Sequence, residues 1–284
     1  MTLKLELHAD EVTTVPPPAP LFVMAPRLGY LPQVSSQALQ HFASVLPPGE
    51  NQPWFEYQGV PLKWHIPTGA LYDLLSEGEY PWCLTMHFRA YPSDVLQPLA
   101  TSTSTETLVE KGEDLASTDI AMQASYLNSL KEAAYVLTGN SNAVMSLTKK
   151  SQQELWTNVL EAKSRDFYNN IGKMDLNKPL RSRIPVRIYA REKIFDSFTG
   201  WKSIDYASKA LHIGEDTDKD ELTAKHLVVN TMEHLNEADL ENVKVVAAGV
   251  QVSLDSNIAE VYSHLKNADM WLYLCILLQK SQKD

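Results

Sequence analysis

The chain has 284 residues and a formal net charge of −10, with 44% hydrophobic and 21% charged residues, a balance that excludes wholesale disorder. The charge is −5 over residues 1–98, −2 over 99–178 and −3 over 179–284, so no segment has the basic excess of a nucleic-acid-binding surface. Its two cysteines exclude a disulfide framework and a four-thiolate zinc site.

Proline is distributed unevenly along the chain. Fourteen of the 16 prolines lie between Pro16 and Pro98, and only Pro179 and Pro185 follow. Because proline breaks helices, the proline-free interval predicts a helical insert between two other domains. The longest apolar stretch, residues 270–278, has nine residues, whereas a membrane-spanning helix needs about 20. With no charged-then-apolar signal segment at the start, we expect a cytoplasmic protein.

Residues 1–98 are expected to form one small domain of strands and helices. The predicted order is a strand at 3–7, a strand at 21–31, a helix at 36–46, a strand at 54–64, a short helix at 69–75 and a strand at 82–90. Alternation of apolar and polar residues supports the first and last strands. Leu39, Phe42 and Leu46 lie on one face of the longer helix.

Residues 99–178 are expected to form a linker, at 99–106, followed by a small helical domain. Apolar residues three and four positions apart form one helix face: Leu127, Leu130, Ala134 and Leu137. Gly139-Asn140-Ser141 is typical of a helix end. Ser151 and Glu154 have the spacing of a capping box, which predicts a helix start there and an apolar stripe that extends to Phe167.

Residues 179–284 repeat the order of the first domain. A strand is predicted at 184–189, a helix at 221–235, a strand at 243–252, a helix at 257–265 and a strand at 270–278. At an offset of 190 residues, Gly59 matches Gly249 and Tyr72 matches Tyr262. With one residue fewer, Trp82 matches Trp271. These matches indicate two copies of one α+β module.

The module has the element order of the ubiquitin-like β-grasp fold, in which a helix packs on one face of a mostly antiparallel sheet. Neither copy ends in the Gly-Gly tail of ubiquitin-like modifiers, because the sequence closes with Gln279-Lys-Ser-Gln-Lys-Asp284. We therefore do not expect the chain itself to be attached to a target through its C-terminus.

Three blocks of sequence resemble the autophagy protein 5 family. The first is Phe55-Glu-Tyr-Gln-Gly-Val-Pro-Leu-Lys-Trp-His-Ile-Pro-Thr-Gly-Ala-Leu-Tyr-Asp-Leu-Leu75. The second is Lys131-Glu-Ala-Ala-Tyr-Val-Leu-Thr-Gly-Asn-Ser-Asn-Ala-Val-Met-Ser-Leu147, and the third is Ile184-Pro-Val-Arg-Ile-Tyr189. The resemblance spans nearly the whole chain. It implies two ubiquitin-like domains, at 1–98 and 179–284, flanking a linker and helix-rich domain at 99–178.

The resemblance also implies a function in autophagy. In the family, autophagy protein 12 is joined to a lysine by an isopeptide bond, and the matching block makes Lys131 that acceptor. The conjugate binds the N-terminal helix of autophagy protein 16. This assembly acts like a ligase that transfers autophagy protein 8 to phosphatidylethanolamine at the preautophagosomal membrane. The implied partners therefore include the autophagy conjugating enzymes and peripheral contact with a membrane, but no nucleic acid, metal or cofactor.

Two features of the sequence bear on these implied partners. The family usually has a short helix with an aromatic–glycine pair before its first strand, and residues 1–7 contain no counterpart. Lys131 is predicted to lie at the flank of the apolar helix face, where the amine reaches solvent while its stem covers apolar surface. Lys149 and Lys150 offer alternative acceptors nearby.

The sequence does not favour the alternative of an enzyme. Cys83 and His87 lie four residues apart in one predicted strand, so their backbones are ~13 Å apart, beyond hydrogen-bond reach. We expect Cys83 and Cys275 to be core residues. A metal site formed by His65, His87 and Glu56 is the other alternative, but their spacing matches no metal motif, so satisfied or exposed histidines are favoured. No phosphate-binding glycine motif occurs.

A second class of function stays open. Many ubiquitin-like modules gather partners without covalent attachment, so the chain could also be a non-covalent β-grasp adaptor. Modification that is lost on Lys131→Arg would separate a conjugated scaffold from such an adaptor.

Overall fold

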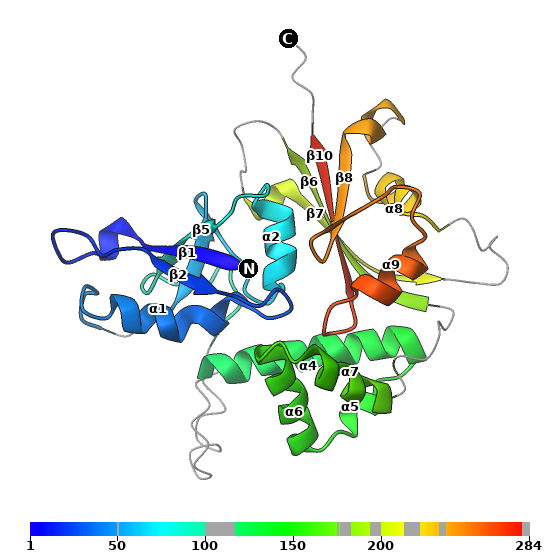
Figure 1. Ribbon diagram of the computed structural model, residues 1–284, viewed down its shortest axis with the longest axis horizontal. Coiled ribbons are helices and arrows are strands. Elements are labelled where there is room, and N and C mark those ends of the chain that lie inside the picture. Colours follow the sequence, from blue (N-terminus) through cyan, green and yellow to red (C-terminus); the bar gives the residue numbers. More distant parts are fainter. Residues whose placement is uncertain are drawn as a thin grey trace. The chain divides into compact units, whose positions relative to one another are not determined.

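The computed structural model contains two sheets whose strands follow equivalent orders (Figure 1). It describes residues 1–49, 51–99, 117–174, 176, 183–193, 200–212, 222–232 and 237–279. The chain divides into two compact units, Met1–Leu71 with Gly78–Tyr126 and Tyr72–Glu77 with Leu127–Asp284. Most of the predicted linker at 99–106 and the predicted domain boundary at 178 lie outside the described residues.

The first sheet has the strand order β2-β1-β5-β3-β4. Its elements are β1 (Thr2–Leu7), the 3-10 helix η1 (Ala9–Glu11), β2 (Leu21–Met24), η2 (Leu31–Val34), α1 (Ser35–Phe42), β3 (Trp54–Tyr57), β4 (Val60–Pro61), α2 (Thr68–Leu75) and β5 (Trp82–His87). β1 pairs antiparallel with β2 and parallel with β5. Leu3, Leu5 and Leu84 alternate toward one buried face, and Phe42 of α1 is also buried.

The second sheet has the equivalent order β7-β6-β10-β8-β9. Its elements are β6 (Arg183–Lys193), η4 (Trp201–Ser203), β7 (Ile204–His212), α8 (Ala224–Thr231), η5 (Glu237–Asn242), β8 (Val243–Ala247), β9 (Val250–Val252), α9 (Ile258–Leu265) and β10 (Leu272–Gln279). β6 pairs antiparallel with β7 and parallel with β10. The predicted α+β class and the duplicated module are therefore confirmed. The strand β7 was not predicted from the sequence.

Each of the two strands predicted at 54–64 and 243–252 is instead a β-hairpin. The first hairpin turns at Gln58 and Gly59, with φ of 50° and 82°, and the second at Ala248 and Gly249, with φ of 50° and 84°. Two consecutive positive φ angles are typical of a two-residue hairpin turn whose twist matches the strands, and glycine adopts them at little cost. The repeat at an offset of 190 residues therefore reflects a shared turn.

The helical segment contains α4 (Ser117–Thr138), α5 (Asn142–Met145), α6 (Lys149–Leu160) and α7 (Ser164–Lys173). All four residues of the predicted α4 face are buried: Leu127, Leu130, Ala134 and Leu137. None of the helices in the described ranges is long and apolar enough to cross a bilayer.

The predicted start of α6 was wrong by three residues, because the capping box placed the N-cap at Ser151. Thr148 has extended backbone angles and its side chain accepts from the backbone N–H of Ser151, so Thr148 is the N-cap. The predicted apolar stripe also does not continue to Phe167 within one helix. α6 ends at Leu160, and Ala162 has a φ of 52°, so the buried Phe167 belongs to α7.

Two further expectations for the first domain need correction. The strand predicted at 21–31 ends at Met24, because Pro26 and Gly29 follow and the chain then forms a 3-10 helix. The predicted burial of Cys83 was wrong. Cys275 is buried, but Cys83 is only half-buried, because it points away from the buried face of its strand.

Candidate conjugation site

Lys131 lies in the second half of α4, next to the apolar face that packs into the core. Leu130 and Ala134 are fully buried, whereas Lys131 is half-buried and Glu132 is exposed. The ammonium of Lys131 donates to Asn128 Oδ1 at 3.3 Å, one helical turn back on an exposed part of the helix. The predicted acceptor therefore has its stem against protein and its amine at the surface.

The C-terminal end of α4 is fixed a short distance beyond Lys131. Gly139 follows the last helical residue with a φ of 81°, and its N–H donates to the carbonyl of Tyr135 at 2.8 Å. The Thr138 hydroxyl donates to the carbonyl of Ala134 at 2.9 Å. A left-handed glycine is a common helix terminator because it has no side chain to clash. The chain then turns back through Asn140 into α5.

An ion pair joins α4 to the second sheet next to Lys131. The Glu132 carboxylate accepts from the guanidinium of Arg187 in β6 at 2.8 Å. Glu132, the acidic residue next to Lys131 in the sequence, therefore pairs with Arg187 and not with Lys131. Within the described ranges, no carboxylate lies within ion-pair distance of the Lys131 amine.

The buried carboxylate of Asp269 also holds α4 in place. Its side chain is fully buried, and Oδ2 accepts from the hydroxyls of Ser129 and Tyr273, both at 2.6 Å. Oδ1 accepts from the backbone N–H of Trp271 at 3.2 Å, and Arg187 lies 3.7 Å away. Buried carboxylates are tolerated when hydrogen-bond donors and a cation surround them. This network ties α4 to the start of β10.

Arg187 and Trp271 also help to hold the part of α4 that carries Lys131. The guanidinium lies over the Trp271 ring at 4.3 Å and donates to the Tyr273 hydroxyl at 2.8 Å. Burial alone lowers the pKa of Arg187, but the acidic groups of Tyr273 and Asp269 outweigh it and raise the pKa above its usual value. The Trp271 indole N–H donates to the Ser129 carbonyl at 3.0 Å. Arg187 is therefore a permanent cation in a fixed position.

A hollow of about 430 Å³ opens beside Lys131. Its lining comes from α4, the turn that follows α4 and the start of β10: Lys131, Glu132, Tyr135, Val136, Ser141 and Trp271. Tyr135 is 59% exposed, whereas Trp271 is buried and contributes a fixed wall. All six residues belong to the second compact unit. The site thus combines an accessible amine with an adjoining, largely apolar depression.

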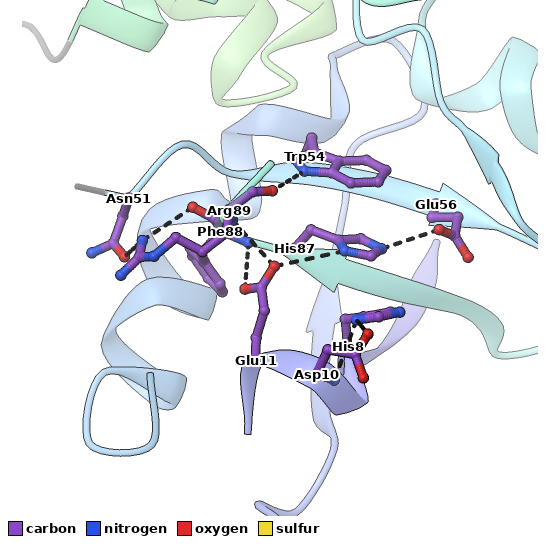
Figure 2. Close-up of polar contacts among 9 residues, drawn as sticks. All are labelled: His8, Asp10, Glu11, Asn51, Trp54, Glu56, His87, Phe88 and Arg89. Carbon is purple, nitrogen blue, oxygen red and sulfur yellow. Dashed lines mark hydrogen bonds and ion pairs between the residues drawn. The ribbon is translucent and has the colours of Figure 1, made fainter. Parts of the chain in front are cut away.

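The residues considered for catalysis or metal binding lie in the first domain instead. Figure 2 shows His87 between two carboxylates, with Nε2 3.1 Å from Glu56 and Nδ1 3.7 Å from Glu11. Its ring stacks on Trp54 at 3.8 Å and on His8 at 4.4 Å. Both ring nitrogens therefore face carboxylates, as expected of a satisfied histidine in the interior.

Neither enzymatic chemistry nor metal binding gains support from these contacts. Burial raises the pKa of the Cys83 thiol, and Glu79 raises it further, so the thiolate that a nucleophile requires is disfavoured. The structure does place His87 against Glu56, as the metal hypothesis needed. Yet no group of three or more His, Cys, Asp or Glu side chains among the described residues could hold a metal ion.

The histidine stack predicts a pH-dependent stability. Burial lowers the pKa of His87, and the nearby His8 lowers it further, despite the opposing effect of Glu56 and Glu11. A lowered pKa means that the unfolded chain binds the proton more tightly, so stability is complete above about pH 6.5 and decreases as the pH falls below it. We expect the free energy of unfolding to decrease between pH 7.5 and pH 5.5, and His87→Gln to reduce that decrease.

Urea unfolding at both pH values measures this effect. The matched control is His264→Gln, because His264 is exposed in α9, and the change should keep the pH dependence of the parent chain. A pH dependence of His87→Gln equal to that of the parent would contradict the prediction.

The sequence did not reveal the network that supports α4. Ser129 and Asp269 are 140 positions apart in the chain, so no local pattern links them. One signal was available, because Arg187 is the single charge within the apolar strand at 184–189. A charge in such a position generally needs a buried partner.

Three family models match successive parts of the chain. "Autophagy protein ATG5, UblA domain" matches residues 1–88 and "Autophagy protein ATG5, alpha-helical bundle region" matches residues 120–174. "Autophagy protein ATG5, UblB domain" matches residues 183–276. The matched order, two ubiquitin-like domains with a helical bundle between them, therefore confirms the predicted fold.

Curated relatives and a solved structure show the same similarity. "Autophagy protein 5" of Oryza sativa subsp. indica is 36% identical over 260 residues, covering 79% of this chain and 64% of the relative. That of Arabidopsis thaliana is 29% identical over 340 aligned positions, covering 99% and 96%. The crystal structure of Kluyveromyces marxianus Atg5 matches with a TM-score of 0.74 at 20% identity, covering 97% of this chain and 95% of that chain. The match to the rice relative thus spans less than two thirds of its length.

Proposed function

The chain belongs to the autophagy protein 5 family, and we propose that it is an autophagy scaffold that carries autophagy protein 12 on Lys131. In this proposal the conjugate binds the N-terminal helix of autophagy protein 16. The assembly then promotes, like a ligase, the transfer of autophagy protein 8 to phosphatidylethanolamine. The chain itself contributes no catalytic residue and acts by positioning its partners.

The placement of Lys131 is the observation that supports this proposal. Its amine lies at the surface of α4, with its stem against the core and a hollow beside it. The helix that carries Lys131, α4, is held in place by the buried carboxylate of Asp269 and by the ion pair of Glu132 with Arg187. An acceptor amine on a fixed backbone spends little conformational entropy when an activated partner approaches.

The proposed modification is an acyl transfer to the Lys131 amine. A conjugating enzyme carries the C-terminal carboxyl group of autophagy protein 12 as a thioester on a cysteine. The deprotonated amine attacks the thioester carbonyl, a C–N bond forms and the C–S bond breaks, and the cysteine leaves as a thiolate. The amine loses two protons in total, one before attack and one after it. The conjugating enzyme must provide the base, because lysine is mostly protonated at neutral pH.

The proposal places the protein in the cytoplasm and, as part of the assembly, peripherally at the preautophagosomal membrane. An integral membrane protein, in contrast to a peripheral one, would require a long apolar helix. Conjugating enzymes and autophagy proteins 12 and 16 are the proposed partners. Each is a proposal that follows from family membership together with the acceptor geometry.

Reconstitution with autophagy protein 12 and its activating and conjugating enzymes tests the proposal. We expect the full chain to gain the mass of one modifier, and Lys131→Arg to abolish that gain. Arginine keeps the positive charge and the long stem but is not acylated under these conditions, so the fold should be unchanged.

The double variant Lys149→Arg/Lys150→Arg is the matched control, because both lysines are exposed at the start of α6. It should be modified like the parent chain. Loss of modification only in the control, or modification that persists in Lys131→Arg, would contradict the assignment. An unmodified parent chain that still binds the autophagy protein 16 helix would indicate the non-covalent adaptor.

A further inference from the structure

Asn128 lies one turn before Lys131 on α4 and presents a neutral oxygen to its amine. The Lys131 ammonium donates to Asn128 Oδ1 at 3.3 Å. Residues three positions apart are neighbours on the surface of a helix, so the contact follows from their spacing. Asn128 is exposed and Lys131 is half-buried. The amide oxygen therefore contacts the proposed reacting nitrogen at the surface, where an activated partner can reach both groups.

The backbone that carries Asn128 is held in place by the next residue, Ser129. The Ser129 hydroxyl donates to the buried carboxylate of Asp269 at 2.6 Å, and its carbonyl accepts from the Trp271 indole at 3.0 Å. Only the side-chain torsions of Asn128 then have to be ordered for its contact with Lys131. The entropic cost of that contact is therefore low.

The acidic groups near Lys131 are engaged with other partners. Glu132 pairs with Arg187 at 2.8 Å, and Asp269 is fully buried within its own network of donors. Tyr135, one turn further along α4, lines the hollow with its phenol ring. The oxygen that the Lys131 amine contacts therefore belongs to a neutral amide and not to a carboxylate.

Two other lysines show what a carboxylate in the place of this amide does. Lys4 lies 2.6 Å from Glu6, and Lys163 contacts Glu161. In both pairs the glutamate raises the pKa of the lysine, first through the hydrogen bond and then through its opposite charge. A raised pKa leaves less of the unprotonated amine, which is the nucleophilic form. A neutral amide orients an amine but stabilises its ammonium form less than a carboxylate does.

We propose that Asn128 orients the amine of Lys131 for acyl transfer, and that its neutral amide leaves the amine reactive. This inference rests on the proposed function, because it requires Lys131 to be the acceptor. An N–H of the unprotonated amine donates to Oδ1 while the nitrogen lone pair forms the C–N bond to the thioester carbonyl carbon. The C–S bond breaks and the cysteine of the conjugating enzyme leaves as a thiolate. The base of that enzyme takes the extra proton from the nitrogen.

The amide oxygen also faces the positive charge that develops on the attacking nitrogen. An oriented dipole that is already in place stabilises such a charge without reorganisation. The distance of 3.3 Å in the free chain fits this role, because catalytic hydrogen bonds are often long before the partner binds and shorten in the complex. Asn128 therefore contacts the reacting nitrogen directly and does not act through another residue.

Single-turnover transfer from a conjugating enzyme already charged with autophagy protein 12 isolates this step. We expect Asn128→Ala to lower the transfer rate roughly two- to tenfold, the effect of losing one hydrogen bond. The midpoint of its pH–rate profile should stay close to that of the parent, because no charge changes. Asn128→Gln keeps the amide oxygen on a longer stem and should recover most of the rate.

Asn128→Asp places a carboxylate against the amine and tests the importance of the neutral oxygen. The rate at pH 7.5 should fall roughly two- to fivefold, and the pH–rate profile should move to higher pH by about half a unit, the size expected of an exposed ion pair. A distorted helix could lower the rate but would not move the profile. Asn169→Asp is the matched control, because Asn169 is exposed in α7 and the change adds the same charge. It should keep the rate and profile of the parent.

Two results would overturn the role of Asn128 and leave the proposed function in place. Both require that the parent chain is conjugated at Lys131. In the first, Asn128→Ala transfers at the parent rate. In the second, Asn128→Asp keeps the parent profile, or transfers at pH 7.5 as fast as the parent or faster. A parent chain that is not modified at all would refute the proposed function, and the role of Asn128 would fail with it.

Discussion

Asp269→Ala is expected to lower the free energy of unfolding by about 3–5 kcal/mol, the range for removing one partner of a buried ion pair. The change leaves Arg187 without its buried counter-charge and removes the acceptor of the Ser129 and Tyr273 hydroxyls. The backbone N–H of Trp271 also loses its acceptor. Asp269→Asn should cost less, because the amide oxygen can still accept a hydrogen bond.

Urea unfolding followed by tryptophan fluorescence measures this loss. Asp255→Ala is the matched control, since Asp255 is exposed in the same unit and exposed substitutions usually change stability by less than about 0.5 kcal/mol. A cost for Asp269→Ala below about 1 kcal/mol would show that the network contributes little to holding α4 in place.

Glu11→Ala should destabilise the first domain by about 3 kcal/mol. The Glu11 side chain is nearly buried and accepts from the backbone N–H groups of Phe88 at 2.8 Å and of Arg89 at 3.1 Å, as Figure 2 shows. A buried donor left without an acceptor costs roughly 1–3 kcal/mol. The carboxylate also faces Nδ1 of His87 at 3.7 Å, so its removal loosens the end of β5 as well.

Asp10→Ala tests whether this effect is specific. Asp10 precedes Glu11 in the same 3-10 helix but is exposed, with its carboxylate 4.0 Å from the ring of His8. Thermal and urea unfolding of both variants should show a large loss for Glu11→Ala and little change for Asp10→Ala. Similar losses for the two variants would mean that the short helix as a whole, and not the buried carboxylate, determines the cost.

The duplicated module could be predicted because its signals are local. Gly59 and Gly249 occupy the same left-handed turn position in the two hairpins, and α2 and α9 begin and end 190 residues apart. Turn geometry and helix boundaries depend on a few neighbouring residues, so two copies of one module keep them in register. The single-strand interpretation failed because a two-residue turn interrupts the apolar pattern only briefly.

The parts that could not be predicted depend on distant or weakly patterned residues. β7 contains serine, alanine, lysine and aspartate among its apolar residues, and as an edge strand it stays partly exposed, so its alternation is faint. Asp269 lies in a short turn before β10, and its partners come from α4 and β6. These residues are distant in the sequence and come together only when the chain folds.

Lys131 itself was identified by resemblance and not by chemistry. A half-buried lysine on an amphipathic helix is common in any protein, and the residues that distinguish this one, Arg187 and Asp269, lie far away in the sequence. The structure adds the fixed support and the adjoining hollow. Those two features make Lys131 a more specific candidate than the exposed Lys149 and Lys150.

Mass spectrometry of the conjugate tests the central claim most directly. After reconstitution of the full chain with autophagy protein 12 and its enzymes, the conjugate is digested and searched for branched peptides. The account predicts one dominant branched peptide, with the C-terminal residue of the modifier joined to Nζ of Lys131. A branch at Lys149, Lys150 or another lysine, with Lys131 recovered unmodified, would contradict it.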